Sequence, residues 1–224
     1  MAGPASSSPL VVAVLGSSCA AGVGASNFQM AWTNRYAIHL ATARPGSRIV
    51  NLSVAGHTTY HVMPTTFKPP LGRPAPDAAH NITHALSLKP SAIILSFPTA
   101  DVAAGYAVQE QMTNLDALVK EAQKQKVPVW VTTSQPRAAS PVQRQQLAEL
   151  RGRIMSTFGD RALDFWTGLA KEDGTIKPEC QGSDGVAIND QGHGMLYDRM
   201  VAANLPMKIA LAAATMPKTN PPLT

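Results

Sequence analysis

The sequence has few of the residues that mark several common protein classes. Only two of its 224 residues are cysteine, aromatic residues make up 5% and charged residues 15%. Two cysteines cannot build a disulfide framework, and neither has a metal-ligand partner at close spacing. No run of about 18 uninterrupted apolar residues is present, so a membrane-spanning helix is not expected. We therefore expect a soluble globular chain held together by an ordinary apolar core.

The positive charge of the chain is not gathered in one place. The formal net charge is +5 and the isoelectric point is near 9.4, but Lys and Arg are scattered along the sequence. This pattern does not favour nucleic-acid binding. Residues 1–9 lack the basic and apolar regions of a signal peptide. The compartment stays open, and secretion or periplasmic export, with the signal absent from this chain, is one expectation. Nothing in the sequence indicates the oligomeric state.

Strand-like and helix-like segments alternate along the chain. The predicted strands are apolar and β-branched: 10–15, 48–52, 92–96, 127–132 and a weaker fifth at 161–165. The predicted helices lie between them: 31–43, 81–88, 108–125 and 141–158. Such alternation predicts one α/β domain with a five-stranded parallel sheet and helices on both faces. We expect this domain to span residues 10–210, after a flexible lead (1–9) and before a C-terminal tail (211–224).

A glycine- and serine-rich turn follows the first predicted strand. It reads Gly16-Ser-Ser-Cys-Ala-Ala-Gly22 and leads toward a helix. A serine at such a turn places a hydroxyl where backbone N–H groups can stabilise a developing anion. Phosphate binding is the alternative interpretation, but the glycine spacing fits neither the dinucleotide fingerprint nor a Walker loop.

Three later segments also follow strands or precede the last helix. The first contains Gly56 and the second contains Asp101. The third consists of Asp184-Gly-Val-Ala187 followed by Asn189-Asp-Gln-Gly-His193. With the first turn, they resemble in order the sequence blocks of the SGNH (GDSL-like) hydrolases, over about residues 10–205. The resemblance implies a three-layer, flavodoxin-like fold. It also implies that Ser18 is the nucleophile and that the N–H groups of Ser18 and Gly56 bind the oxyanion.

The chain departs from the family pattern at two polar positions. The third block of the family ends in Asn-Asp, and its Asn donates to the oxyanion, but here Ala100 precedes Asp101. The fifth block is Asp-x-x-His, whereas this chain reads Asp184-Gly-Val-Ala187. Asp184 would thus orient a base that is missing at position 187. Without an imidazole, Ser18 keeps its proton at neutral pH and is a poor nucleophile.

A second Asp-x-x-His pattern leaves two interpretations of His193 open. Asp190 and His193 have the spacing of a catalytic pair, so His193 is a candidate for a displaced general base. In the family, a Gly followed by His or Tyr also recurs just beyond the catalytic His, at the start of the final helix. Gly192-His193 fits that position, which makes His193 a structural residue instead. The sequence does not say whether Ala100 and Ala187 are natural or engineered.

The other histidines and the cysteines offer weaker candidates. His57 and His61, and likewise His80 and His84, are four residues apart, but no carboxylate completes a metal triad in the sequence, so we expect no metal site. We expect these side chains to be solvated or to line a pocket. Cys19 and Cys180 are interpreted as buried free thiols, with a local disulfide as the alternative.

Two functions are compatible with these observations. The first is a serine ester hydrolase scaffold for small O-acyl esters, impaired by alanine at positions 100 and 187. The resemblance implies acetylated carbohydrate, short-chain or lysophospholipid esters as substrates, and it implies no cofactor. The second is an inactive binding module that holds an acylated or carbohydrate ligand.

Overall fold

The sheet contains five parallel strands. The computed structural model describes residues 8–215. The strands are β1 (Val11–Gly16), β2 (Arg48–Asn51), β3 (Ala92–Ser96), β4 (Val129–Thr132) and β5 (Ala162–Leu163), in the spatial order β2-β1-β3-β4-β5. All four pairings are parallel. The predicted parallel α/β sheet is therefore confirmed, and its strand order is that of flavodoxin-like folds.

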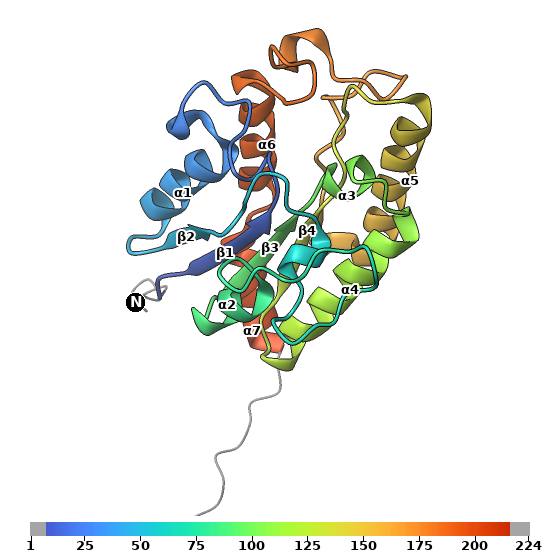
Figure 1. The fold of residues 1–224 in the computed structure, drawn as a ribbon. Coiled ribbons are helices and arrows are strands. Elements are labelled where there is room, and N and C mark those ends of the chain that lie inside the picture. The colour runs from blue at the N-terminus through green and yellow to red at the C-terminus, as the bar shows by residue number, and fades with distance from the viewer. Residues whose placement is uncertain (1–7, 216–224) are drawn as a thin grey trace, which may run out of the picture.

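Helices cover both faces of the sheet (Figure 1). The helices are α1 (Trp32–Ala43), α2 (Ile82–Ser87), α3 (Ala100–Ala103), α4 (Val108–Lys124), α5 (Pro141–Phe158), α6 (Asp190–Ala202) and α7 (Leu205–Thr215). One apolar core joins the sheet to α2, α4 and α5, and a second joins it to α1, α6 and α7. Successive side chains of β1 pack alternately into the two cores, because side chains point to opposite faces along a strand. The result is the expected three-layer sandwich.

Local signals set several helix boundaries. The Ser140 side chain accepts a hydrogen bond from the Gln143 N–H, Gln143 bonds back to Ser140, and Pro141 occupies the first turn. This capping box with its proline explains why α5 begins where the sequence predicts. The Asn81 side chain caps α2 in the same way, by accepting from the His84 N–H.

The structure differs from the expected boundaries in two places. Strand β5 is shorter than the predicted 161–165, because the Asp164 carboxylate accepts hydrogen bonds from the N–H groups of Trp166 and Thr167 and turns the chain. Helix α7 continues to Thr215, past the expected domain end at residue 210, and its Ile209 is buried in the second core. The expected flexible lead and the rest of the tail fall mainly on residues 1–7 and 216–224, which lie outside the described residues.

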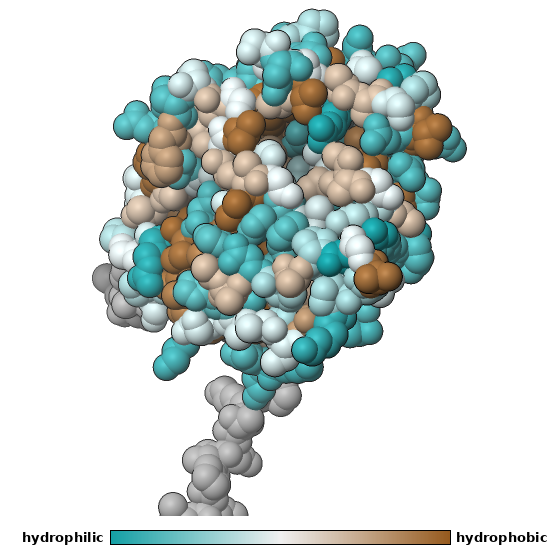
Figure 2. Space-filling model, viewed as in Figure 1, coloured by the Kyte–Doolittle hydropathy of each residue, from teal (hydrophilic) through white to brown (hydrophobic). Residues whose placement is uncertain are grey.

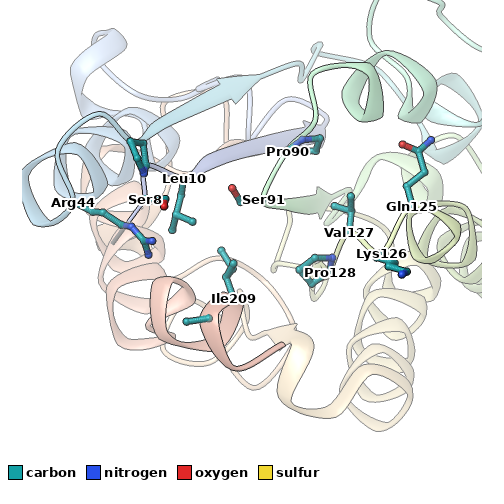
Figure 3. Close-up of a pocket in the computed structure, with 12 residues that line it drawn as sticks. Ser8, Leu10, Arg44, Pro90, Ser91, Gln125, Lys126, Val127, Pro128 and Ile209 are labelled. Carbon is teal, nitrogen blue, oxygen red and sulfur yellow. The ribbon is translucent and has the colours of Figure 1, made fainter. Parts of the chain in front are cut away.

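The two edges of the sheet differ. A cavity of about 380 Å³ lies at the amino edge, lined by residues that precede β1, β3 and β4, with Leu10, Pro90 and Pro128 among them (Figure 3). The predicted site residues instead follow the strands, so they belong to the carboxyl edge, where ligands bind in open parallel sheets. None of the helices within residues 8–215 combines the length and hydropathy needed to cross a bilayer.

Candidate active site

Three segments of the carboxyl edge meet at Gly16, the last residue of β1. A Cβ atom at this position would lie 2.7 Å from the Cβ of Ala20, 2.8 Å from the Oγ of Ser53 and 2.8 Å from the carbonyl oxygen of Ser96. Only glycine fits such a close approach. Gly16 therefore brings the turn after β1, the loop after β2 and the end of β3 together.

Ser18 lies in the turn that Gly16 opens. The turn is fixed by its neighbours: the Ser17 N–H donates to the Ser96 carbonyl at 3.0 Å, and the Val23 N–H donates to the Ser18 carbonyl at 2.9 Å. Ser18 itself is half-buried. Within residues 8–215, neither its hydroxyl nor its N–H has a hydrogen-bond partner. A nucleophile and an oxyanion donor both need such free groups.

Gly56 presents a second free N–H. The loop after β2 is tied to the first turn by the Val54 N–H, which donates to the Gly16 carbonyl at 3.2 Å. Gly56 is exposed and has a φ of +86°, a conformation that favours glycine. No acceptor within the described residues receives its N–H. The N–H groups of Ser18 and Gly56 are thus two unpaired backbone donors, in the two loops that Gly16 brings together.

A buried carboxylate links the loop of Gly56 to the segment of Ala100. Asp101 is fully buried and accepts hydrogen bonds from the Thr59 N–H at 3.1 Å and the Thr59 hydroxyl at 2.5 Å. The Asn114 amide donates to the same hydroxyl at 2.9 Å, so the hydroxyl proton must point to Asp101. Burial raises the pKa of Asp101 to about 7. Asp101 thus ties Thr59 to the start of α3, where half-buried Ala100 lies.

The Asp184–Ala187 segment lies against the turn after β1. A Cβ at Gly24 would lie 2.9 Å from the Cβ of Ala187 and 2.1 Å from the carbonyl oxygen of Ile188, so this contact also requires glycine. Figure 1 shows the orange segment before α6 and the blue loop after β1 at the same end of the sheet. Figure 2 shows the surface hollowed at this end, with polar and apolar residues interspersed around the hollow.

The Asp184 carboxylate is held by backbone groups of its own segment. It accepts hydrogen bonds from the N–H groups of Val186 at 2.9 Å and Ala187 at 2.8 Å. These bonds lower the pKa of Asp184, so the carboxylate is ionised at neutral pH. The arrangement is an Asx-type turn that aims residue 187 toward the loop of Gly24. A methyl group stands where the resemblance expects an imidazole.

The comparison of sequences identifies the family. The model of the GDSL-like lipase/acylhydrolase family matches residues 14–195. The chain belongs to the GDSL-like lipase/acylhydrolase family. This match runs from β1 into α6 and includes every segment of the site described above. No curated protein matches the chain.

Solved structures share the GDSL-like fold at low sequence identity. The psychrotrophic esterase EstA from Pseudoalteromonas sp. has a TM-score of 0.63 and 16% identity, covering 90% of this chain and 98% of that one. The lipase/acylhydrolase from Enterococcus faecalis has a TM-score of 0.62 and 14% identity, covering 94% and 100%. A two-domain esterase active on acetylated mannans has a TM-score of 0.60 and 18% identity, covering 96% of this chain and 54% of that one.

His193 is buried among backbone groups of this GDSL-like chain. Its Nδ1 accepts a hydrogen bond from the Trp32 N–H at 3.3 Å, so its Nε2 carries the proton and donates to the Val23 carbonyl at 3.1 Å. Burial lowers the pKa of His193 and keeps the ring neutral. Neither nitrogen is free to receive a proton from Ser18. This geometry favours the structural interpretation and gives no support to His193 as a displaced base.

Three of the other histidines, His57, His61 and His80, gather beside the loop of Gly56. The rings of His57 and His61 stack with centroids 4.4 Å apart, and His80 lies edge-on to His57. Asp77, which the sequence did not connect with them, accepts from His80 Nδ1 at 2.8 Å and lies 3.5 Å from His57 Nε2. Asp77 thus adds a carboxylate to this cluster of histidines. Even so, no group of three or more ligand side chains within residues 8–215 is arranged to hold a metal.

The two cysteines are free and buried. Burial raises the pKa of Cys19 to about 12 and also raises that of Cys180, so both stay protonated. The local disulfide that the sequence left open is absent. The interpretation as inert buried thiols agrees with these surroundings.

Arg137 was missed by the sequence analysis. It lies in the loop after β4, and its Nη1 donates to the Thr99 hydroxyl at 3.3 Å, next to Ala100. Its charge also contributes to the lowered pKa of Asp184. The sequence does contain one signal for it, because Arg137 follows a predicted strand as the other site segments do.

Proposed function

We propose that this chain is a serine ester hydrolase scaffold for small O-acyl esters, impaired as it stands. Membership of the GDSL-like lipase/acylhydrolase family supports ester hydrolysis as the reaction class. The observation that carries the proposal is the pair of unpaired N–H groups at Ser18 and Gly56 beside an unpaired Ser18 hydroxyl. That combination suits attack on an acyl carbonyl and stabilisation of the resulting oxyanion.

In the proposed reaction, Ser18 Oγ attacks the acyl carbonyl and forms a tetrahedral intermediate. The Ser18 and Gly56 N–H groups donate to its oxyanion, and Ala100 marks the place of a third donor. Asp184 would orient a base at position 187. Because Ala187 supplies none, the Ser18 proton has no acceptor and acylation is slow. A base contributes typically 10²–10⁴-fold to such a step.

The proposed substrates are small acyl esters, with acetyl groups on carbohydrate as one class. Its support is indirect: one structural neighbour is an esterase active on acetylated mannans. Short-chain and lysophospholipid esters are the other classes that the family resemblance suggests.

A second candidate function is a binding module without turnover. The observation that favours it is alanine at both position 100 and position 187. A methyl group at each position keeps the shape of the site but supplies neither an oxyanion donor nor a base. In this case an acylated or carbohydrate ligand would bind beside Ser18 and stay intact.

Hydrolysis of p-nitrophenyl acetate distinguishes the two functions. We expect a rate near background for the chain itself and an increase of about 10²–10⁴-fold for Ala187→His. Ser18→Ala in the Ala187→His background is the control and should abolish the gain. If folded Ala187→His shows no gain, the hydrolase proposal fails. Calorimetric binding of an acetylated oligosaccharide without its hydrolysis would then support the binding module.

A further inference from the structure

The guanidinium of Arg137 lies between two segments of the site. It contacts Thr99, the residue before Ala100, through Nη1, and it lies close enough to Asp184 to lower the pKa of that carboxyl. Its loop is held in place, because the Gln135 N–H donates to the Pro98 carbonyl at 3.4 Å. Arg137 therefore places a positive charge beside the segment of Ala100, one of the segments at the carboxyl edge of the sheet.

Arg137 has no carboxylate partner, in contrast to two other half-buried arginines. Arg73 pairs with Glu110, and Arg151 pairs with Asp164 at 2.9 Å. For Arg137, the Thr99 hydroxyl is the one hydrogen-bond acceptor among the described residues, and no ion pair is formed there. A guanidinium has five N–H donors, so most of those of Arg137 remain available.

A small cavity opens beside this guanidinium. Its volume is about 100 Å³, and it lies between α3 and the start of α5, lined by Thr99, Ala103, Arg137 and Gln143 among others. None of its lining residues is acidic. The volume suits a small planar group rather than a sugar ring. A cation, a hydroxyl and an amide around such a space match the hydrogen-bonding needs of a carboxylate.

We propose that Arg137 and Thr99 form a subsite for a carboxylate carried by the ester substrate. The proposal rests on the proposed function. It narrows the substrate class from small O-acyl esters in general to those that carry a carboxylate. Arginine binds a carboxylate through two parallel N–H···O bonds, which lysine cannot reproduce. A site built around such a group rejects an analogue that leaves the cation unpaired. The carboxylate belongs to either the acyl half or the alcohol half of the ester.

Binding to the unaltered chain tests the subsite apart from catalysis. Two matched pairs of esters serve as probes: monomethyl succinate against dimethyl succinate for the acyl half, and O-acetyl-lactate against its methyl ester for the alcohol half. We expect the anionic member of one pair to bind about tenfold or more tightly than its neutral partner, measured from ¹⁵N shifts of the Thr99 and Ala100 amides. The pair that discriminates identifies the half that carries the carboxylate.

Three variants show whether Arg137 causes this preference. Arg137→Gln should remove it, so that the anionic and neutral esters bind equally, and Arg137→Lys should retain part of it. Arg153→Gln removes the same charge from the exposed face of α5 and should retain all of it. Equal binding of anionic and neutral esters in both pairs would overturn the proposal, as would a preference that survives Arg137→Gln.

Kinetics in the Ala187→His background provide the second readout. There, Arg137→Gln should raise KM for the anionic ester about tenfold and change kcat little, because the subsite holds a group remote from the reacting carbonyl. A binding preference without any ester hydrolysis would retain the subsite and reject the proposed function. Hydrolysis of both esters with equal kcat/KM would retain the proposed function and reject the subsite.

Discussion

Two segments of this chain carry the same Asp-x-x-x pattern and are built for different purposes. Asp184 stands in an exposed turn, its carboxylate held by backbone N–H groups, with Ala187 at the third position after it. Asp190 begins α6 and binds the Ser26 N–H at 2.8 Å and hydroxyl at 2.6 Å, while His193 is sealed among backbone groups. His193 of the second segment has no free ring nitrogen, and the first segment has alanine at the corresponding position. The spacing of the motif therefore does not identify the base, whereas the surroundings of its last residue do.

The largest expected effect comes from placing a histidine at position 187, in the segment of Asp184. Ala187→His alone should raise kcat/KM more than Ala100→Asn alone, because the base decides whether Ser18 can lose its proton at all, whereas two oxyanion donors remain without residue 100. An oxyanion donor is worth about 3 kcal/mol. The double variant should show interaction between the changes, since residues that act as a unit are not additive.

The measurement is kcat/KM on one short-chain ester for both single variants and the double variant. If Ala100→Asn restores high activity while Ala187→His does nothing, position 187 is not the base position. The roles assigned to the Asp184 segment and the Asp190 segment would then have to be exchanged.

The next largest expected effect is a difference in kcat/KM between Asp184→Asn and Asp190→Asn, each made in the Ala187→His background. Asp184→Asn should remove most of the restored kcat/KM, because an amide no longer fixes the imidazole in the productive tautomer. Asp190→Asn is the matched control and should leave kcat/KM nearly unchanged at a temperature where both proteins are folded. An equal loss in the two variants, with melting temperatures unchanged, would contradict the distinct roles assigned to them.

The third effect concerns stability rather than activity. His193→Ala should lower the free energy of unfolding by about 2–4 kcal/mol, because it leaves the N–H of buried Trp32 unpaired, removes the hydrogen bond to the Val23 carbonyl and opens a void. Urea unfolding monitored by circular dichroism measures this change. A variant as stable as the parent would mean that His193 does not hold the loop after β1 to α6.

His193 also predicts a pH dependence with a definite sign. Its pKa is lowered in the folded state by burial, so the unfolded chain binds this proton more readily. The contribution of His193 to stability is therefore complete above the unfolded pKa of about 6.5 and is lost as the pH falls below it. The difference in unfolding free energy between the parent and His193→Ala should shrink from pH 7.5 to pH 5. A constant difference would contradict the buried neutral ring.

The smallest effect is expected at the start of α6. Ser26→Ala removes one of the two hydrogen bonds to Asp190, while the Ser26 N–H keeps the other. These bonds lower the pKa of Asp190, so the variant should move that pKa toward its usual value and reduce stability less than His193→Ala does. Carbon-detected NMR titration of the Asp190 carboxyl gives the pKa directly. A pKa unchanged by Ser26→Ala would show that the Ser26 hydroxyl does not stabilise the Asp190 carboxylate.

Much of the fold could be predicted from the sequence because its signals are local. Strand β3 and helix α5 match their predicted bounds, since an apolar β-branched run and a Ser-Pro start act within a few residues. Helix α7 was not predicted from the sequence, because its mostly small apolar side chains give no pattern of polar residues to mark a helix face.

The site was predictable only in part, and the reason is also physical. Ser18 and Gly56 belong to turns that follow strands, and strand ends meet at one edge of a parallel sheet. The sealed ring of His193, the pairing of Asp77 with two histidines and the free guanidinium of Arg137 all depend on contacts between segments far apart in the chain. No spacing within one segment encodes such contacts.

The glycine at position 24 limits how this site can change. Its Cα lies so close to the Ala187–Ile188 backbone that any side chain at 24 would push the two loops apart. Variation at residue 187 is therefore tolerated only in chains that keep Gly24, whereas variation at residue 24 would misplace residue 187 whatever its identity. In a library that randomises both positions, we expect every variant with increased esterase activity to retain Gly24.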